Sequence, residues 1–183
     1  MWKQVPNLLT IARIAIAPYL FVLMWRHDYR GLLWPFALVG VTDVLDGFIA
    51  RRLHAASRLG AILDPIADKL LLSGTFLVLA LTGAIEVWIA WVVLGRDVLV
   101  LAGAGALSLA RPGTQFPPSP WGKLSTFVQV LFVMFAMGAL SGIHVEPAVI
   151  ALKWAVTVLA ALTLVDYARR MFAAPVNRSV SSP

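Results

Sequence analysis

Six apolar stretches, each long enough to cross a lipid bilayer as a helix, account for most of this chain. A transmembrane helix needs about 20 predominantly apolar residues, and the stretches reach that length at residues 6–26, 31–53, 60–82, 86–110, 122–142 and 147–171. Charged residues make up only 13% of the chain, against about 25% in soluble domains. The sequence therefore predicts an all-α integral membrane protein with six transmembrane helices, and it excludes an ordinary soluble fold.

The segments outside these stretches predict the rest of the architecture. Residues 1–10 are expected to form an N-terminal interfacial helical segment. Residues 111–122 contain four prolines, which are incompatible with a regular helix. Residues 173–183 are polar, and the ends of domains are frequently poorly ordered. We therefore expect one membrane domain over residues 1–172, followed by a disordered cytoplasmic tail.

The distribution of lysine and arginine predicts the orientation of the chain in the membrane. If both termini are cytoplasmic, the cytoplasmic segments hold nine cations and the opposite side holds only Arg26 and Arg30. Cytoplasmic loops carry the excess of positive charge in membrane proteins. We therefore expect a multi-pass membrane protein with both termini cytoplasmic. Contact with anionic membrane lipids then explains the net charge of +6, and no nucleic-acid partner is expected.

Four of the nine acidic residues lie inside the predicted helices, as the pairs Asp43 and Asp46, then Asp64 and Asp68. A charge at bilayer depth costs several kcal/mol, so such residues are rare and usually functional. Spacings of three and four residues place each pair on one helix face. Because consecutive helices are antiparallel, all four carboxylates are expected at a similar depth near the cytoplasmic side.

Four carboxylates gathered in one place need cations to stay ionised. Oxygen ligands suit Mg²⁺ or Mn²⁺, and a pair of such ions is an arrangement for phosphoryl chemistry. Arg51, about one turn beyond Asp46, suits a phosphate. The residues thus predict a cytoplasm-facing two-metal site for a phosphate ester. Two other interpretations stay open: a proton or cation pathway, and ion pairs that pack the helices through Lys69 and Arg96.

The spacing of these acids resembles the signature of the CDP-alcohol phosphatidyltransferase family. The pattern D-x-x-D-G-x-x-A-R occupies Asp43–Arg51, Gly60 follows after eight residues, and Asp64 and Asp68 follow at four-residue steps. The opening at Pro6–Arg13 is similar to the bacterial branch of the family, and the similarity extends to Gly122 and Lys123.

The resemblance implies a homodimeric enzyme that transfers a phosphatidyl group from CDP-diacylglycerol to an alcohol and releases CMP on the cytoplasmic side. Two Mg²⁺ ions, or Mn²⁺, would be held by Asp43, Asp46, Asp64 and Asp68. Asp68 would also act as general base on the acceptor hydroxyl. Contacts with CDP-diacylglycerol are implied for Gly47, Ala50, Arg51, Ser57, Asn7 and Thr10.

The acceptor alcohol is less clearly marked by the sequence. The chain resembles the phosphatidylglycerophosphate synthase branch, whose acceptor is glycerol 3-phosphate, and this acceptor is the one we expect. The Gly95-Arg96-Asp97 run and the later Gln129 also resemble cardiolipin synthases of the eukaryotic type, whose acceptor is phosphatidylglycerol. Arg96 and Lys123 are candidates for binding the acceptor phosphate. The alternatives are that Arg96 pairs with Asp97 or Asp43 and that Lys123 is a cytoplasmic end charge.

Two further hypotheses belong to other functional classes. A small ion or proton transporter would use the four acids as a relay, and a non-catalytic scaffold would not use them at all. A relay needs the acids but has no need of a phosphate-binding Arg51 at this interval. Elsewhere we expect Lys153 to reach the membrane interface or to pair with Glu146.

Overall fold

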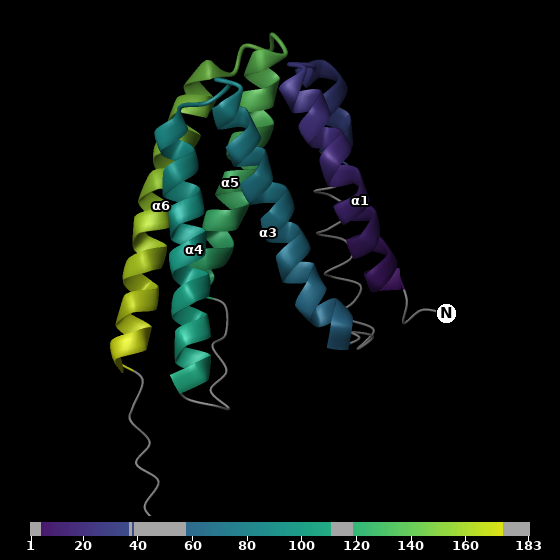
Figure 1. The fold of residues 1–183 in the computed structure, drawn as a ribbon. Helices are drawn as coiled ribbons and strands as arrows, with labels where there is room; N and C mark the ends of the chain where they lie inside the picture. The colour runs from purple at the N-terminus through teal and green to yellow at the C-terminus, as the bar shows by residue number, and fades with distance from the viewer. Residues whose placement is uncertain (1–4, 37, 39–57, 111–118, 174–183) are drawn as a thin grey trace, which may run out of the picture.

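The computed structural model of the chain describes residues 5–36, 38, 58–110 and 119–173. Within these residues the backbone forms helices and turns, with no strand. The helices are α1 (Val5–Trp25), α3 (Arg58–Leu81), α4 (Val87–Ala110), α5 (Pro120–Leu140) and α6 (Glu146–Ala173), and a helical segment over residues 29–36 follows α1 (Figure 1). The all-α prediction is therefore confirmed for the described part of the chain.

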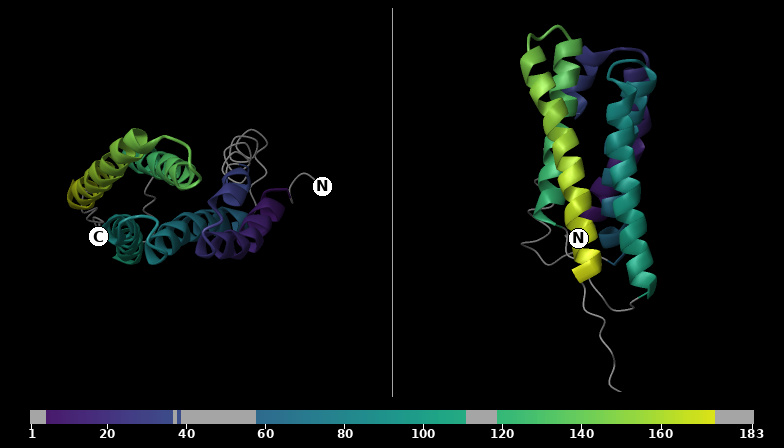
Figure 2. Two further views of the ribbon diagram at one scale, coloured as in Figure 1. Left: turned by 90° about the horizontal axis from the view of Figure 1, so that it is seen from above. Right: turned by 90° about the vertical axis from the view of Figure 1, so that its left-hand side faces the viewer.

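The long helices run side by side; α3, α4, α5 and α6 alternate in direction, and α1 runs in the same direction as α3 (Figure 1). Seen along the helices, α5 and α6 lie on one side and α4, α3 and α1 form a row on the other (Figure 2). Helix α3 is the most widely shared element, because it packs against α1, α4 and α5.

Three connections meet at one end of the molecule, which we call the turn end: residues 26–28, 82–86 and 141–145. At each of them the preceding helix closes with a residue of positive φ, namely His27 (58°), Gly83 (73°) and Gly142 (91°). The amide of the next residue then donates back to a carbonyl five residues earlier, as Ala84 does to Leu79 at 2.8 Å. This closure satisfies carbonyls that the helix end would otherwise leave unpaired.

Helix α5 begins at a capped start. Ser119 has an extended backbone and its hydroxyl accepts a hydrogen bond from the Gly122 amide at 3.0 Å. Pro120 occupies the first helical position, where its missing N–H costs nothing. The helix therefore begins at Pro120, two residues before the predicted start of the stretch at 122.

The core is one cluster of buried apolar side chains to which α1, the segment 29–36 and helices α3 to α6 all contribute. Phe76 on α3 and Phe132 on α5 are both buried, and their rings stack with centroids 5.8 Å apart. The same cluster contains buried aliphatic side chains, including Leu20, Leu32, Leu79, Val133 and Met137. The stacked pair links the two sides of the bundle, since it joins helices that contact each other only slightly elsewhere.

Three sequence predictions about the architecture have different outcomes. By length and apolar composition, two described helices qualify as membrane-spanning, over Pro120–Leu140 and Glu146–Arg170, so six spans are not shown. Residues 5–10 are helical as expected and form the start of α1, while their position at the membrane interface stays a prediction. The expected tail at 173–183 lies outside the described residues except for Ala173, which ends α6.

The predicted partner of Lys153 is wrong. Its ammonium bonds Glu86 in the α3–α4 connection at 2.7 Å, and not Glu146 on its own helix. Glu146 lies seven residues earlier on α6, which is two helical turns, or about 10 Å along the axis. Glu86 reaches Lys153 because the fold brings the α3–α4 connection beside α6, and no local sequence pattern indicates that approach.

Candidate active site

Most of the predicted metal and donor residues lie outside the described residues. These are Asp43, Asp46, Gly47, Ala50, Arg51 and Ser57. The predicted positions that the structure does describe as backbone are Asp64 and Asp68 in α3 and Asn7 and Thr10 in α1.

Asp64 and Asp68 occupy the first half of α3, one helical turn apart. Positions four residues apart share a helix face, as the sequence spacing predicted. Two carboxylates on one face are suitable oxygen donors for a hard divalent ion such as Mg²⁺. The described residues by themselves contain no group of three or more potential ligands, so the four-aspartate site stays a prediction.

Asn7 and Thr10 lie in the first turns of α1, which packs against α3. Both helices begin at the end opposite the turn end (Figure 1). The fold thus places the start of α1 and the aspartate-bearing half of α3 at the same end of the bundle. This arrangement is consistent with a shared site, although it tests none of the proposed donor contacts.

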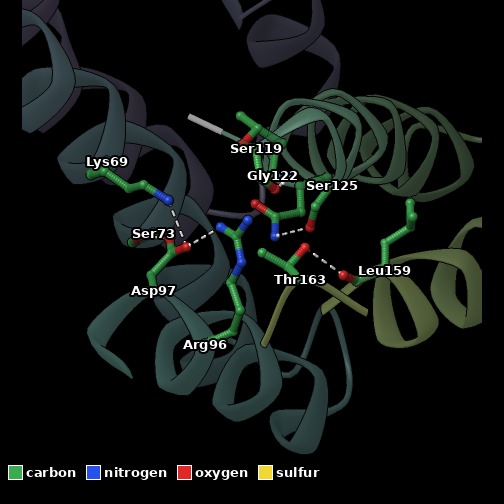
Figure 3. Close-up of polar contacts among 11 residues, drawn as sticks. Lys69, Ser73, Arg96, Asp97, Ser119, Gly122, Ser125, Leu159 and Thr163 are labelled. Atoms are coloured by element: carbon green, nitrogen blue, oxygen red, sulfur yellow. Dashed lines mark hydrogen bonds and ion pairs between the residues drawn. The ribbon is translucent and has the colours of Figure 1, made fainter. Parts of the chain in front are cut away.

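A partly buried ion network is centred on Asp97 of α4 and begins at Lys69, the residue that follows Asp68. Its Oδ1 accepts from the Lys69 ammonium at 2.5 Å and from Nη1 of Arg96 at 2.5 Å, while its Oδ2 accepts from the Ser73 hydroxyl at 3.2 Å (Figure 3). The Asp97 side chain is only 9% exposed, and the Lys69 side chain is 47% exposed. One carboxylate therefore binds two cations, and the network carries a surplus positive charge.

Arg96 is the most deeply buried charged side chain of this network, with 4% exposure. It pairs with Asp97, as one of the sequence alternatives anticipated. Its Nε has no hydrogen-bond partner among the described residues. An arginine with a buried, unused donor retains capacity for a further acceptor, so the pairing with Asp97 does not exclude a role in binding an anion.

The start of α5 lies against the Arg96 guanidinium. A β-carbon built on Gly122 would be 3.6 Å from Nη2 of Arg96 and 3.6 Å from Oγ of Ser119. Arg96 is the tenth residue of α4, and its long side chain reaches from α4 to the first turn of α5, although the described backbones of these two helices do not pack against each other. Lys123 follows Gly122 and is exposed, so the Arg96 guanidinium reaches the turn that carries the other predicted acceptor residue.

Further polar side chains continue inward from this junction on α5 and α6. Gln129 is fully buried and donates to the Ser125 hydroxyl at 3.4 Å. Its Oε1 has no partner within the described part of the chain. Thr163 is also buried, and its hydroxyl donates to the Leu159 carbonyl at 2.6 Å, which satisfies it locally (Figure 3).

The sequence analysis missed the roles of Lys69 and Ser73. Lys69 was considered only as a general counter-ion for the acids, and Ser73 was not singled out. Their spacing of four residues on α3 is the signal that was available, because it places both donors on one face. Their common partner, Asp97, is 24 residues beyond Ser73 and could be identified only from the packing of α3 on α4.

Comparison with known proteins identifies the family that shares these positions. A sequence model of CDP-alcohol phosphatidyltransferases matches residues 3–163. This match spans the paired aspartates, the Arg96–Asp97 pair and the start of α5.

Curated relatives carry two different names. A cardiolipin synthase (CMP-forming) of Rattus norvegicus is 35% identical over 74% of this chain, and the alignment covers 50% of the relative. A CDP-diacylglycerol–glycerol-3-phosphate 3-phosphatidyltransferase of Pseudomonas fluorescens is 34% identical over 73% of this chain and 72% of its own length. A "Probable phosphatidylglycerophosphate synthase" of Mycobacterium tuberculosis is 34% identical over 90% of this chain and 79% of its own length. The chain thus spans about half the length of the animal cardiolipin synthases it matches.

Proposed function

The chain belongs to the CDP-alcohol phosphatidyltransferase family, and on this premise we propose that it transfers a phosphatidyl group from CDP-diacylglycerol to glycerol 3-phosphate. The products are phosphatidylglycerophosphate and CMP. The observation that carries the proposal is the family match over residues 3–163, which includes the D-x-x-D-G-x-x-A-R segment together with Asp64 and Asp68. The match favours a transferase over the ion or proton transporter considered from the acids alone.

The proposed metal site uses Asp43, Asp46, Asp64 and Asp68 for two Mg²⁺ ions, with Mn²⁺ as a possible substitute. The one-turn spacing of Asp64 and Asp68 on α3 supports it, as does the chemistry of carboxylate oxygens. When bound, the two ions would neutralise the diphosphate and stabilise the charge on the departing CMP.

Asp68 has a second proposed task as general base. The acceptor hydroxyl oxygen forms a new bond to the phosphorus that carries the diacylglycerol, and the bond from that phosphorus to the CMP oxygen breaks. Asp68 takes the hydroxyl proton as the attack proceeds. CMP leaves with the electron pair of the broken bond, so no covalent enzyme intermediate is required.

The donor is proposed to bind through Gly47, Ala50, Arg51 and Ser57, with help from Asn7 and Thr10. Small residues let a diphosphate approach the helix backbone closely, and Arg51 supplies a charge-assisted hydrogen bond. The position of Asn7 and Thr10 at the same end of the bundle as Asp64 is consistent with this assignment.

The acceptor phosphate is proposed to bind between Arg96 and Lys123. Three observations support an anion there: the surplus positive charge around Asp97, the unused Nε of Arg96, and the start of α5 beside it. The positive end of the α5 dipole favours an anion, although Ser119 already accepts from the Gly122 and Lys123 amides. Glycerol 3-phosphate and phosphatidylglycerol both carry a phosphate, so a phosphate-binding site here does not distinguish between the two acceptors.

The choice of glycerol 3-phosphate over phosphatidylglycerol rests on the chemistry of the two acceptors. A small soluble acceptor needs only a polar pocket open to the cytoplasm. A lipid acceptor also needs a second acyl groove that reaches the metals, and the sequence identifies none. The similar level of identity to the cardiolipin synthases keeps the lipid acceptor as the alternative.

The proposal includes a membrane topology: six spans, both termini and the active site cytoplasmic, in the cell (inner) membrane, as a homodimer. The gathering of residues 26–28, 82–86 and 141–145 at one end supports the alternating arrangement.

The topology can be tested by labelling introduced cysteines from either side of the membrane. The chain has no cysteine of its own, so a single introduced cysteine is the only residue that a thiol reagent labels. Cysteines at positions 57 and 179 should be labelled only from the cytoplasm, and one at Asp28 only from outside. Labelling of position 57 from outside would reverse the orientation.

The reaction is tested by supplying purified protein with CDP-diacylglycerol, Mg²⁺ and both acceptors together. Release of CMP with formation of phosphatidylglycerophosphate is expected, and chelation should stop both. Formation of cardiolipin, with glycerol 3-phosphate unused, would select the alternative acceptor. Absence of CMP release with either acceptor would contradict the transferase proposal.

A further inference from the structure

We infer that Asp97 is a positioning residue that holds α3 in place for the proposed metal site, an inference that rests on the proposed function. Asp97 binds α3 at two points, through the Lys69 ammonium and the Ser73 hydroxyl. The same carboxylate binds Arg96 on its own helix. It therefore joins the helix that carries Asp64 and Asp68 to the arginine proposed for the acceptor phosphate.

The two contacts lie on one face of α3 and the two aspartates on a neighbouring face. Lys69 and Ser73 are four residues apart, as are Asp64 and Asp68, and positions at this spacing share a face. Lys69 directly follows Asp68, so the two faces are turned by about 100° from each other. One face of α3 is thus anchored on α4, and the positions of the two aspartates lie on the neighbouring face.

Two contacts one helical turn apart constrain α3 in two ways. Two polar contacts one turn apart add to the packing of α3 on its neighbours, since together they oppose both rotation of the helix about its axis and sliding along it. The Asp97 carboxylate is only 9% exposed, and burial from water strengthens such contacts. The position of the aspartate-bearing turn relative to Arg96 is therefore set through Asp97.

An electrostatic role and a positioning role predict opposite results when Lys69 is changed. Lys69→Met removes a positive charge next to Asp68, and charge alone would then favour tighter binding of a divalent cation. Loss of positioning would weaken that binding. Ser73→Ala changes no charge, so weaker cation binding in this variant can come only from altered positions.

The experiment measures Mn²⁺ binding to the purified full-length chain by electron paramagnetic resonance, which does not depend on turnover. Lys69→Met is expected to weaken binding about tenfold, the lower range for residues that support metal ligands. Ser73→Ala is expected to weaken it about three- to tenfold, the equivalent of one lost hydrogen bond. Asp97→Asn is the direct variant, but it leaves two cations without their anion and can prevent folding.

Matched controls come from the turn end. Lys153→Met removes a cation that is likewise paired with an acid, and Ser141→Ala removes a hydroxyl that donates to a helix carbonyl. Both should leave Mn²⁺ affinity unchanged. Thermal unfolding of all four variants shows whether a change in affinity merely follows a loss of stability.

Weaker Mn²⁺ binding in both α3 variants, with unchanged controls, would support the inference. Unchanged affinity in both, or tighter binding in Lys69→Met with no effect of Ser73→Ala, would overturn it and leave the proposed metal site intact. A wild-type chain without saturable Mn²⁺ binding would overturn the metal site of the proposed function, and the positioning role with it.

Discussion

The ring of Phe21 on α1 lies directly against Gly74 on α3. A β-carbon built on Gly74 would come within 2.4 Å of Cζ of Phe21, which is shorter than any ordinary contact between two non-bonded carbon atoms. Helices associate closely where small residues let their surfaces meet. The missing side chain of Gly74 therefore lets the Phe21 ring fill the space between α1 and α3. Gly74 lies on α3, the helix that also carries the proposed metal ligands Asp64 and Asp68.

Gly74→Ala should therefore loosen the α1–α3 contact. Overpacking costs about 1–3 kcal/mol, which exceeds the gain of about 1 kcal/mol from replacing a helical glycine. We expect a lower midpoint of thermal unfolding in detergent.

The control is Gly105→Ala on α4, where no described atom lies within 4 Å of the added carbon. This substitution should leave the midpoint unchanged or raise it. Adding Phe21→Leu to Gly74→Ala should restore part of the loss, and no restoration would contradict the steric explanation.

Substitutions of Gly83 test whether the left-handed backbone that closes α3 at the turn end requires glycine. Its φ of 73° is left-handed, and no described atom lies within 4 Å of an added β-carbon. Gly83→Ala should then destabilise the protein through backbone conformation alone, by about 1–2 kcal/mol. Gly83→Asn should cost less, because asparagine tolerates this conformation. Equal midpoints for the alanine and asparagine variants would contradict this reasoning.

The helices were predictable from sequence because apolar stretches and turn residues mark them directly. The expected stretch 60–82 appears as α3 (Arg58–Leu81), and glycine marks its closure. His27 closes α1 in the same left-handed conformation. Histidine, unlike glycine, does not predict such a helix end from the sequence. Tertiary ion pairs were not predictable beyond neighbours in sequence: the Arg96–Asp97 pair was anticipated, but the approach of Lys69 to Asp97 depends on how two helices pack.

The Glu86–Lys153 pair should make stability depend weakly on pH. The hydrogen bond from the Lys153 ammonium lowers the pKa of Glu86 below its usual 4.5. A carboxylate with a lowered pKa stabilises the fold above about pH 4.5 and loses that contribution as the pH falls through its folded pKa. Glu86 is 51% exposed, so the contribution should be at most about 1 kcal/mol.

The measurement compares wild type with Glu86→Gln by thermal unfolding at about pH 7 and at successively lower pH. The difference between them should shrink as the pH falls. In a Lys153→Met background the pH-dependent difference should disappear, because the cation that lowers the pKa is gone. A difference that persists at low pH would show that Glu86 acts through packing and not through its charge.

Asp64→Asn should abolish phosphatidyl transfer while leaving the helices intact. Residues that merely support metal ligands cost about 10- to 100-fold when removed, so a proposed direct ligand should cost more than about a hundredfold in CMP release. Asp166→Asn is the matched control, since it also removes a helical carboxylate, here one paired with Arg170 at 2.9 Å. Circular dichroism should be unchanged in both. Normal turnover of Asp64→Asn would remove that residue from the metal site.

Lys123→Ala should weaken the acceptor and spare the donor. Lys123 is exposed beside Gly122, which lies against the Arg96 guanidinium, so its loss should remove a charged contact without leaving a buried charge unpaired. A hydrogen bond to a charged group contributes about 1.5–3 kcal/mol, which corresponds to about a ten- to hundredfold higher KM for glycerol 3-phosphate. Lys123→Arg should restore only part of the affinity for glycerol 3-phosphate, because a planar guanidinium and a point charge bind phosphate differently.

The comparison variant is Arg51→Ala, which should show the reverse pattern, with a higher KM for CDP-diacylglycerol and little change for the acceptor. If Lys123→Ala raised the two KM values equally, Lys123 would be acting on the whole site and its assignment to the acceptor phosphate would be wrong.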